Sequence, residues 1–122
     1  MYFTKKERPI IDKDGNITSQ RYVVIDTELT GLNEQRDSIV SIGAVKMDGR
    51  LIKMTQAFHR LIKPTTSLTS KSIIIHKITP SEVEQEPTID KVISEFLEFS
   101  EDRIIIGHFV AIDMTFINKE VR

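Results

Sequence analysis

Two acidic residues, Asp26 and Glu28, stand two positions apart at the end of an apolar run. Side chains two apart on an extended strand point to the same face, so both carboxylates would share one spot while Thr27 points away. Two adjacent negative charges are costly unless a cation is bound between them. Carboxylate oxygens suit Mg²⁺ or Mn²⁺, and paired ions of this kind can promote in-line phosphoryl displacement. A solvated strand end is the alternative interpretation.

The residues around this acidic pair predict a sheet. The β-branched and aromatic run over residues 22–25 is typical of a strand that is buried on both faces. Residues 39–47 predict a second strand, which closes at the turn signal Asp48-Gly49. Residues 51–62 predict its antiparallel partner. The acids would therefore end the first of three consecutive strands.

The second half of the chain has helical signals on both sides of a short strand. Thr79, Pro80 and Glu82 form the pattern of a capping box with proline at the first helical position. The next segment has one apolar stripe, formed by Ile89, Val92, Ile93, Phe96 and Leu97. Residues 103–106 predict a further strand, and a helical pattern starts at Asp113. This order predicts an α/β fold in which a crossover helix joins a hairpin sheet to a parallel strand.

Three segments carry a family resemblance. VIDTELTGL at residues 24–32, with DSIVSIGAV at 37–45, resembles the first motif of the DEDDh-type 3'-5' exonucleases. IHKIT at 75–79 is similar to a connector of that family, and GHFVAIDMTFI at 107–117 resembles its second motif. The family includes the epsilon proofreading subunit of bacterial DNA polymerase III. The three segments occur in the same order as in that family, and the resemblance covers residues 21–122.

The resemblance implies a ribonuclease H-like mixed sheet with flanking helices and a two-metal site. Asp26, Glu28 and Asp113 would be its catalytic metal ligands for two Mg²⁺ or Mn²⁺ ions. The implied substrate-binding residues are Leu29, Thr30, Gly31, Leu32, His76 and Phe116. Some of these have structural alternatives from the residues themselves: core packing for Phe116, a surface position for His76, and a positive φ in a tight turn for Gly31.

The chain also departs from the family pattern. No segment resembles the third motif, whose His is the general base and whose Asp completes the metal shell. We therefore expect this chain to lack the C-terminal strand and helix and to leave one sheet face open. His59 is expected on the surface, and His108 in a structural role. Single-residue departures occur at Leu29, Ser41, Lys77 and Phe109.

Composition limits the remaining possibilities. Seventeen Lys and Arg against eighteen Asp and Glu give a net charge of −1, so no global field attracts a polyanion. The absence of cysteine excludes disulfides and thiolate zinc sites. No run is long enough to span a bilayer, and we expect a cytoplasmic protein with no membrane partner. Residues 1–20 are interpreted as an arm or hairpin, and residues 21–122 as the exonuclease-like domain.

Three functional hypotheses follow. The first is a metal-dependent 3'-5' exonuclease that releases nucleoside monophosphates from nucleic-acid 3' ends, with single-stranded DNA as the expected partner. The second is a non-catalytic module of the same fold that binds nucleic acid or a DNA polymerase subunit through basic residues such as Lys63, Lys71 and Lys77. The third is self-association through the uncovered face of the sheet.

Overall fold

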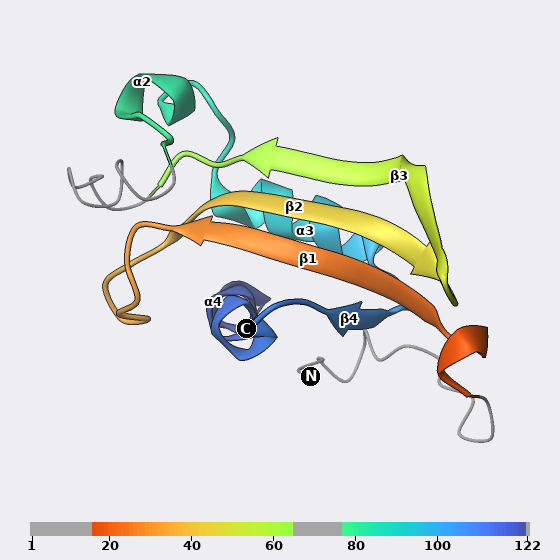
Figure 1. Ribbon diagram of the computed structural model, residues 1–122. Coiled ribbons are helices and arrows are strands. Elements are labelled where there is room, and N and C mark those ends of the chain that lie inside the picture. The colour runs from red at the N-terminus through yellow and green to blue at the C-terminus, as the bar shows by residue number, and fades with distance from the viewer. Residues whose placement is uncertain (1–15, 65–76, 122) are drawn as a thin grey trace.

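The computed structural model describes residues 16–64 and 77–121. Its four strands form one sheet in the order β3-β2-β1-β4 (Figure 1). The strand bounds are Arg21–Leu29 for β1, Ile39–Asp48 for β2, Leu51–Leu61 for β3 and Ile104–Ile106 for β4. β1, β2 and β3 are antiparallel neighbours, whereas β4 is parallel to β1. The predicted mixed α/β sheet is confirmed.

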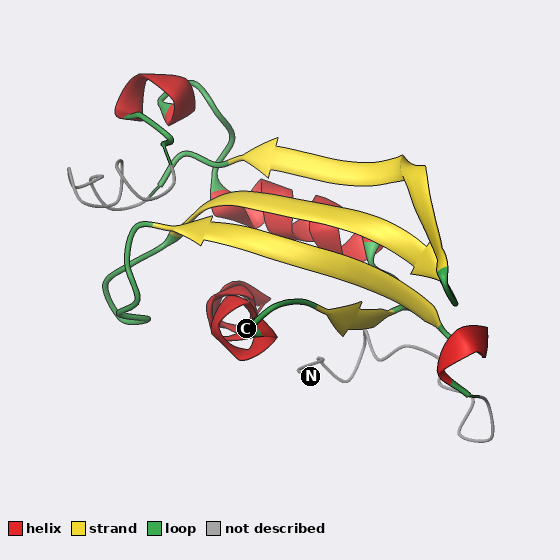
Figure 2. Ribbon diagram, viewed as in Figure 1, coloured by secondary structure: helices red, strands yellow, loops and turns green. Residues whose placement is uncertain are grey.

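The helices follow the predicted order with two differences in their limits (Figure 2). Their bounds are Ile17–Ser19 for the 3-10 helix η1, Pro80–Val83 for α2, Ile89–Phe99 for α3 and Val110–Val121 for α4. The capped segment ends after one turn because Pro87 cannot continue a helix, and Thr88 then caps α3. α4 begins three residues before Asp113, so this acid lies in its first turn.

One face of the sheet packs against α3 and α4. Val23 and Ile25 of β1 alternate toward this core, where they meet the apolar stripe predicted for α3 and the buried residues of α4. Intervening positions of β1 face the other way, and Val24 there is half-buried while Asp26 is exposed. The alternation therefore separates an apolar face from a face that carries charge.

The first half of β1 is where the two halves of the chain meet. Tyr22, Val23 and Val24 pair with the three residues of β4, and the chain then leaves the sheet at Gly107. A Cβ atom at Gly107 would lie 2.8 Å from the carbonyl oxygen of Ile25, so only glycine fits this approach. The segment that leads into α4 thus passes directly beside the residue before Asp26.

Several expectations concern residues outside the described ranges. These are residues 1–15 of the predicted arm, Lys71, and His76 of the predicted connector. Within residues 16–64 and 77–121, no helix is long and apolar enough to cross a membrane.

Candidate active site

The acidic pair lies near the end of β1, on the side of the strand that points away from the core formed with α3 and α4. Asp26 is exposed and Glu28 is half-buried, as the alternation of strand side chains predicts. Their cross-strand partners on β2 are small, with Gly43 opposite Asp26 and Ser41 opposite Glu28. Position 41, one of the departures from the family pattern, thus places a neutral hydroxyl group opposite Glu28. Small neighbours leave room around both carboxylates.

The third predicted ligand reaches the same end of the sheet from α4. Asp113 is only 7% exposed, and its carboxylate accepts a hydrogen bond from the hydroxyl of Thr27. Thr27 points away from Asp26 and Glu28, toward the helices, as predicted. Its hydroxyl therefore ties α4 to β1 at a position between the two acids in the sequence.

The three carboxylates act on one another electrostatically. Partial burial is the main cause that raises the pKa of Glu28, and the charges of Asp26 and Asp113 raise it further. Burial is also the main cause that raises the pKa of Asp113. The hydrogen bond from Thr27 lowers this pKa in part, and the charge of Asp26 raises it. Among the described residues, none of the three forms an ion pair. Within residues 16–64 and 77–121, therefore, no basic side chain is paired with the carboxylates of this site.

The donor types fit a hard divalent cation, since all three are carboxylates and their repulsion would be relieved by positive charge. The positions of the three side chains fit a cation less well than their chemical type does. In the part of the chain that the structure describes, no three His, Cys, Asp or Glu side chains gather closely enough to form a ready metal site. A cation would need to draw these side chains inward.

The loop that follows β1 is held by its own hydrogen bonds and extends beyond the sheet (Figure 2). Thr30 and Ser38 are joined by two bonds, from the Thr30 N–H to the Ser38 carbonyl at 2.9 Å and from the Ser38 N–H to the Thr30 hydroxyl at 3.0 Å. The Asp37 carboxylate accepts from the Thr30 hydroxyl at 3.0 Å and from the Asn33 N–H at 2.9 Å. The loop is therefore a defined structure beside the acids.

Gly31 is required for a different reason than the one expected. The described glycine with positive φ is Gly49, and Gly31 is not in that region. Instead, a Cβ atom at Gly31 would lie 2.4 Å from the carboxylate oxygen of Asp37. Because Thr30 and Asn33 hold this carboxylate, it cannot easily move away. The expectation of a positive φ was wrong, and close approach of Asp37 is the constraint.

α4 also fastens this loop. The Lys119 ammonium group donates to the carbonyl oxygens of Glu34 and Asp37, each at 2.9 Å. The same group lies 5.2 Å from the centre of the Phe116 ring. One helix therefore positions both Asp113 and the loop after β1.

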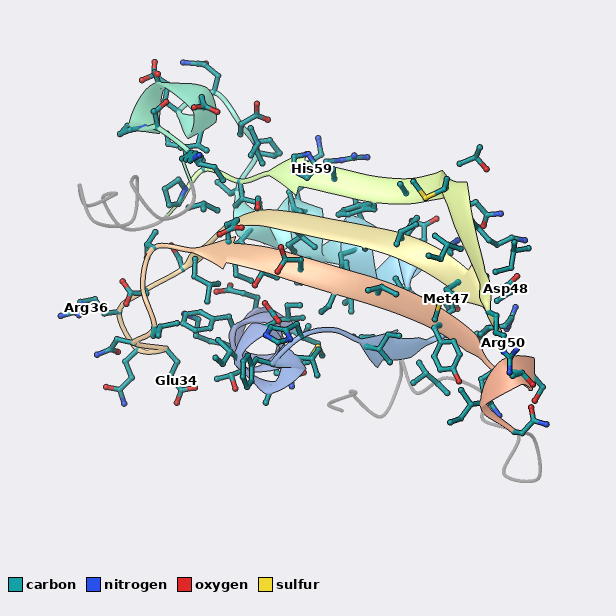
Figure 3. The ribbon with its side chains drawn as sticks, viewed as in Figure 1. Glu34, Arg36, Met47, Asp48, Arg50 and His59 are labelled. Atoms are coloured by element: carbon teal, nitrogen blue, oxygen red, sulfur yellow. The ribbon has the colours of Figure 1, made fainter. Side chains whose placement is uncertain are left out.

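The other predicted substrate-binding residues differ in exposure. Leu32 is 76% exposed at the loop, whereas Leu29 is half-buried and Thr30 is buried. Phe116 is 2% exposed and belongs to the core, which is the packing role that the sequence also allowed. His59 is exposed on β3, away from the loop, as Figure 3 shows.

Sequence reasoning missed three residues that support the site: Thr27, Asp37 and Lys119. Each acts through hydrogen bonds to residues that a strand or helix pattern does not identify. The DSIVSIGAV segment did contain Asp37, but no signal in the sequence indicated that its carboxylate would organise the loop.

Comparison with known proteins agrees with this geometry. The family described as RNase_T exonuclease matches residues 23–122. The PolC-type DNA polymerase III of Thermotoga maritima is 38% identical over 99% of this chain, which spans 9% of that protein. The DNA polymerase III epsilon subunit of Aquifex aeolicus is 36% identical over 85% of this chain, which spans half of it.

Solved structures give the same result. Exonuclease X, in complex with 5' overhanging duplex DNA, is 27% identical with a TM-score of 0.64, over 78% of this chain and 52% of its own. Escherichia coli exonuclease I, in complex with an oligonucleotide, shares the fold with a TM-score of 0.74 at 16% identity, over 84% of this chain and 24% of its own. The mixed sheet is thus ribonuclease H-like, and the chain belongs to the exonuclease family.

Proposed function

We propose that this chain carries the site of a 3'-5' exonuclease that hydrolyses the terminal phosphodiester of a nucleic acid, preferably DNA. The observation that carries the proposal is the electrostatic repulsion among three carboxylates from two elements, Asp26 and Glu28 of β1 and Asp113 of α4. Membership of the exonuclease family and similarity to polymerase III proteins support it. The products would be nucleoside monophosphates.

The roles of the acids follow from their positions. Asp26 is the most exposed of the three and would contact both of two Mg²⁺ or Mn²⁺ ions. Glu28 would hold one of these ions and orient the attacking water. Asp113 would hold the other ion. Such ions supply an activated water and neutralise charge on the phosphate. The hydrogen bond from Thr27 would keep Asp113 turned toward β1.

The loop after β1 would seat the terminal nucleotide. Its tip carries the exposed Leu32, and its backbone is fixed by Asp37 and Lys119. A fixed loop beside the reacting phosphate places the substrate without an ordering cost at each turnover. We assign Leu29, Thr30 and Gly31 to the same contact surface.

A binding module without turnover is the second candidate. It is favoured by the absence, within the described residues, of three side chains already gathered around a cation position. Such a module would hold a nucleic-acid end, or a polymerase subunit as in the polymerase III relatives, and leave the strand intact.

The test is a gel assay with 5'-labelled single-stranded and 3'-recessed DNA in the presence of Mn²⁺ or Mg²⁺. We expect stepwise shortening that Asp26→Ala abolishes and that Glu98→Gln, an exposed acid on α3, leaves unchanged. Shortening that survives Asp26→Ala would contradict the proposal. Binding with no shortening under either metal would favour the second candidate.

A further inference from the structure

Phe109 is the residue near the site that the fold does not explain. It joins β4 to α4, its side chain is 75% exposed, and its φ is 50°. The left-handed region is costly for a bulky side chain and much easier for glycine or asparagine. Phe109 therefore strains the backbone and also leaves an aromatic ring in water. Neither feature stabilises the described fold, which directs attention to a contact outside it.

The other described non-glycine residues with positive φ do not share this combination. Lys77 and Asp102 both have a φ of 60°, but each carries a charged side chain that water stabilises. Phe109 alone among these three places a large apolar group at a strained position. A turn with positive φ therefore does not require an exposed aromatic ring, and the exposure of Phe109 needs a separate explanation.

Phe109 lies in the segment that passes beside β1 and leads to Asp113. Gly107 touches the carbonyl oxygen of Ile25, the residue before Asp26. Two residues of chain span at most about 7 Å, so the Phe109 backbone lies within that distance of Gly107. The Phe109 carbonyl accepts the Ile112 N–H at 3.0 Å, which starts the turn that carries Asp113. Phe109 therefore lies two residues from the close approach to β1 and four residues before Asp113.

A neighbouring ring restricts the orientation of Phe109. The His108 ring packs against it edge to face, with the ring centres 4.4 Å apart and the planes at 68°. Leu32 is a second large apolar side chain exposed near the end of β1, at 76%. Held aromatic rings beside a phosphate-binding position are the arrangement with which proteins stack unpaired bases.

We propose that Phe109 is a stacking platform for an unpaired base of the strand whose terminal phosphodiester lies at Asp26, Glu28 and Asp113. This inference rests on the proposed function and names a binding residue for the same site. Stacking suits a chain with a net charge of −1, since the protein as a whole does not attract a polyanion. Because every base has a π-face, the platform would accept any of the four bases.

The test measures binding of a single-stranded oligonucleotide that carries 2-aminopurine near its 3' end, with Ca²⁺ as the divalent ion. Phe109→Asn removes the ring and suits the positive φ, and Phe109→Trp restores a larger ring. Met54→Asn is the matched control, because Met54 is 77% exposed on β3. We expect Phe109→Asn to weaken binding by about fivefold or more and to reduce quenching of the 2-aminopurine. Phe109→Trp and Met54→Asn should keep both signals.

Thermal unfolding separates stacking from packing. Phe109→Asn should unfold at the same temperature as the unmodified chain or higher, since it relieves backbone strain. A clear decrease would show that the ring packs within the fold and would overturn the proposal. Equal affinity and quenching in Phe109→Asn, with binding that still requires Asp26, would overturn the stacking role alone. Failure of the unmodified chain to bind the oligonucleotide would overturn both this inference and the proposed function.

Discussion

The acidic residues at the two ends of the sheet differ in whether they have ion-pair partners. At the end where β1 finishes, the described structure gives Asp26, Glu28 and Asp113 no ion pair. At the other end, Asp48 is paired with Arg103 at 2.7 Å and with Lys53 at 3.3 Å. Figure 3 shows Asp48 at this end and Glu34 and Arg36 on the loop at the opposite end.

At the paired end, a buried arginine supplies the positive charge for which the described structure shows no counterpart at the acidic end. Arg103 is 8% exposed, and its guanidinium group also donates to the carbonyl oxygen of Tyr22 at 3.0 Å. One buried cation thereby joins the start of β1, the end of β2 and the start of β4. Charges that hold the fold together have partners within it. Charges that lack partners reduce stability and remain available to a ligand.

The largest expected effect is on activity at the unpaired end. Asp113→Asn should lower the rate of strand shortening by about a hundredfold or more, because metal-dependent charge stabilisation is worth several kcal/mol. Asp48→Asn should leave the rate per folded molecule unchanged. The gel assay on both variants checks this, with the folded fraction measured by circular dichroism. Equal losses in the two variants would remove the functional difference between the two ends.

The next effect is on stability at the paired end. Arg103→Met should lower the free energy of unfolding by about 2 kcal/mol, because it leaves the Tyr22 carbonyl without this donor and removes one of the two charge partners of Asp48. Arg60→Met is the control, since Arg60 pairs with Glu95 at 3.0 Å but is 48% exposed. It should cost less than about 1 kcal/mol. Urea unfolding of both variants gives the comparison, and similar losses would contradict it.

A smaller effect concerns the loop at the acidic end. Lys119→Met removes the donor to the carbonyls of Glu34 and Asp37, and we expect a loss of about 1 kcal/mol that is local to the loop. Amide hydrogen exchange should speed up for residues 33–37, while Lys91→Met on the exposed side of α3 should not change it. Unchanged exchange in Lys119→Met would show that the loop's own hydrogen bonds are sufficient.

The smallest effect is on the pH dependence of stability. The pKa values of Glu28 and Asp113 are raised, chiefly by burial, so their ionised forms oppose folding at neutral pH. The free energy of unfolding should therefore increase, through protonation of these acids, as the pH falls from neutral toward 4.5, which is the ordinary pKa of Glu28. The bond from Arg103 lowers the pKa of Asp48, whose contribution is present above 3.8 and is lost as the pH falls below it.

Urea unfolding across this pH range checks the two signs separately. Asp113→Asn should reduce the gain at mildly acidic pH, and Asp48→Asn should reduce the loss at strongly acidic pH. If Asp113→Asn instead removed the loss at low pH, our assignment of the two ends would be reversed.

The fold could be predicted well because its signals are local. Strand alternation gave the direction of Asp26 and Glu28, and the apolar stripe gave the buried face of α3. The site could be predicted only in part. Asp113 came from a family resemblance, since no spacing relates it to β1. The bond from Thr27 spans 86 positions in the sequence, and the contact of Lys119 with Asp37 spans 82, so no periodic pattern reveals either one.

The bond between Thr27 and Asp113 joins residues 86 positions apart, and this separation leads us to expect an order in which the site assembles. Asp26 and Glu28 acquire their geometry as soon as β1 pairs with β2, which requires closure of a short loop. Asp113 arrives only after the chain has closed a loop several times longer, and long-range contacts form slowly for this reason. Tight cation binding would then accompany the last stage of folding. Partly folded chains would then display the acidic pair without the third carboxylate.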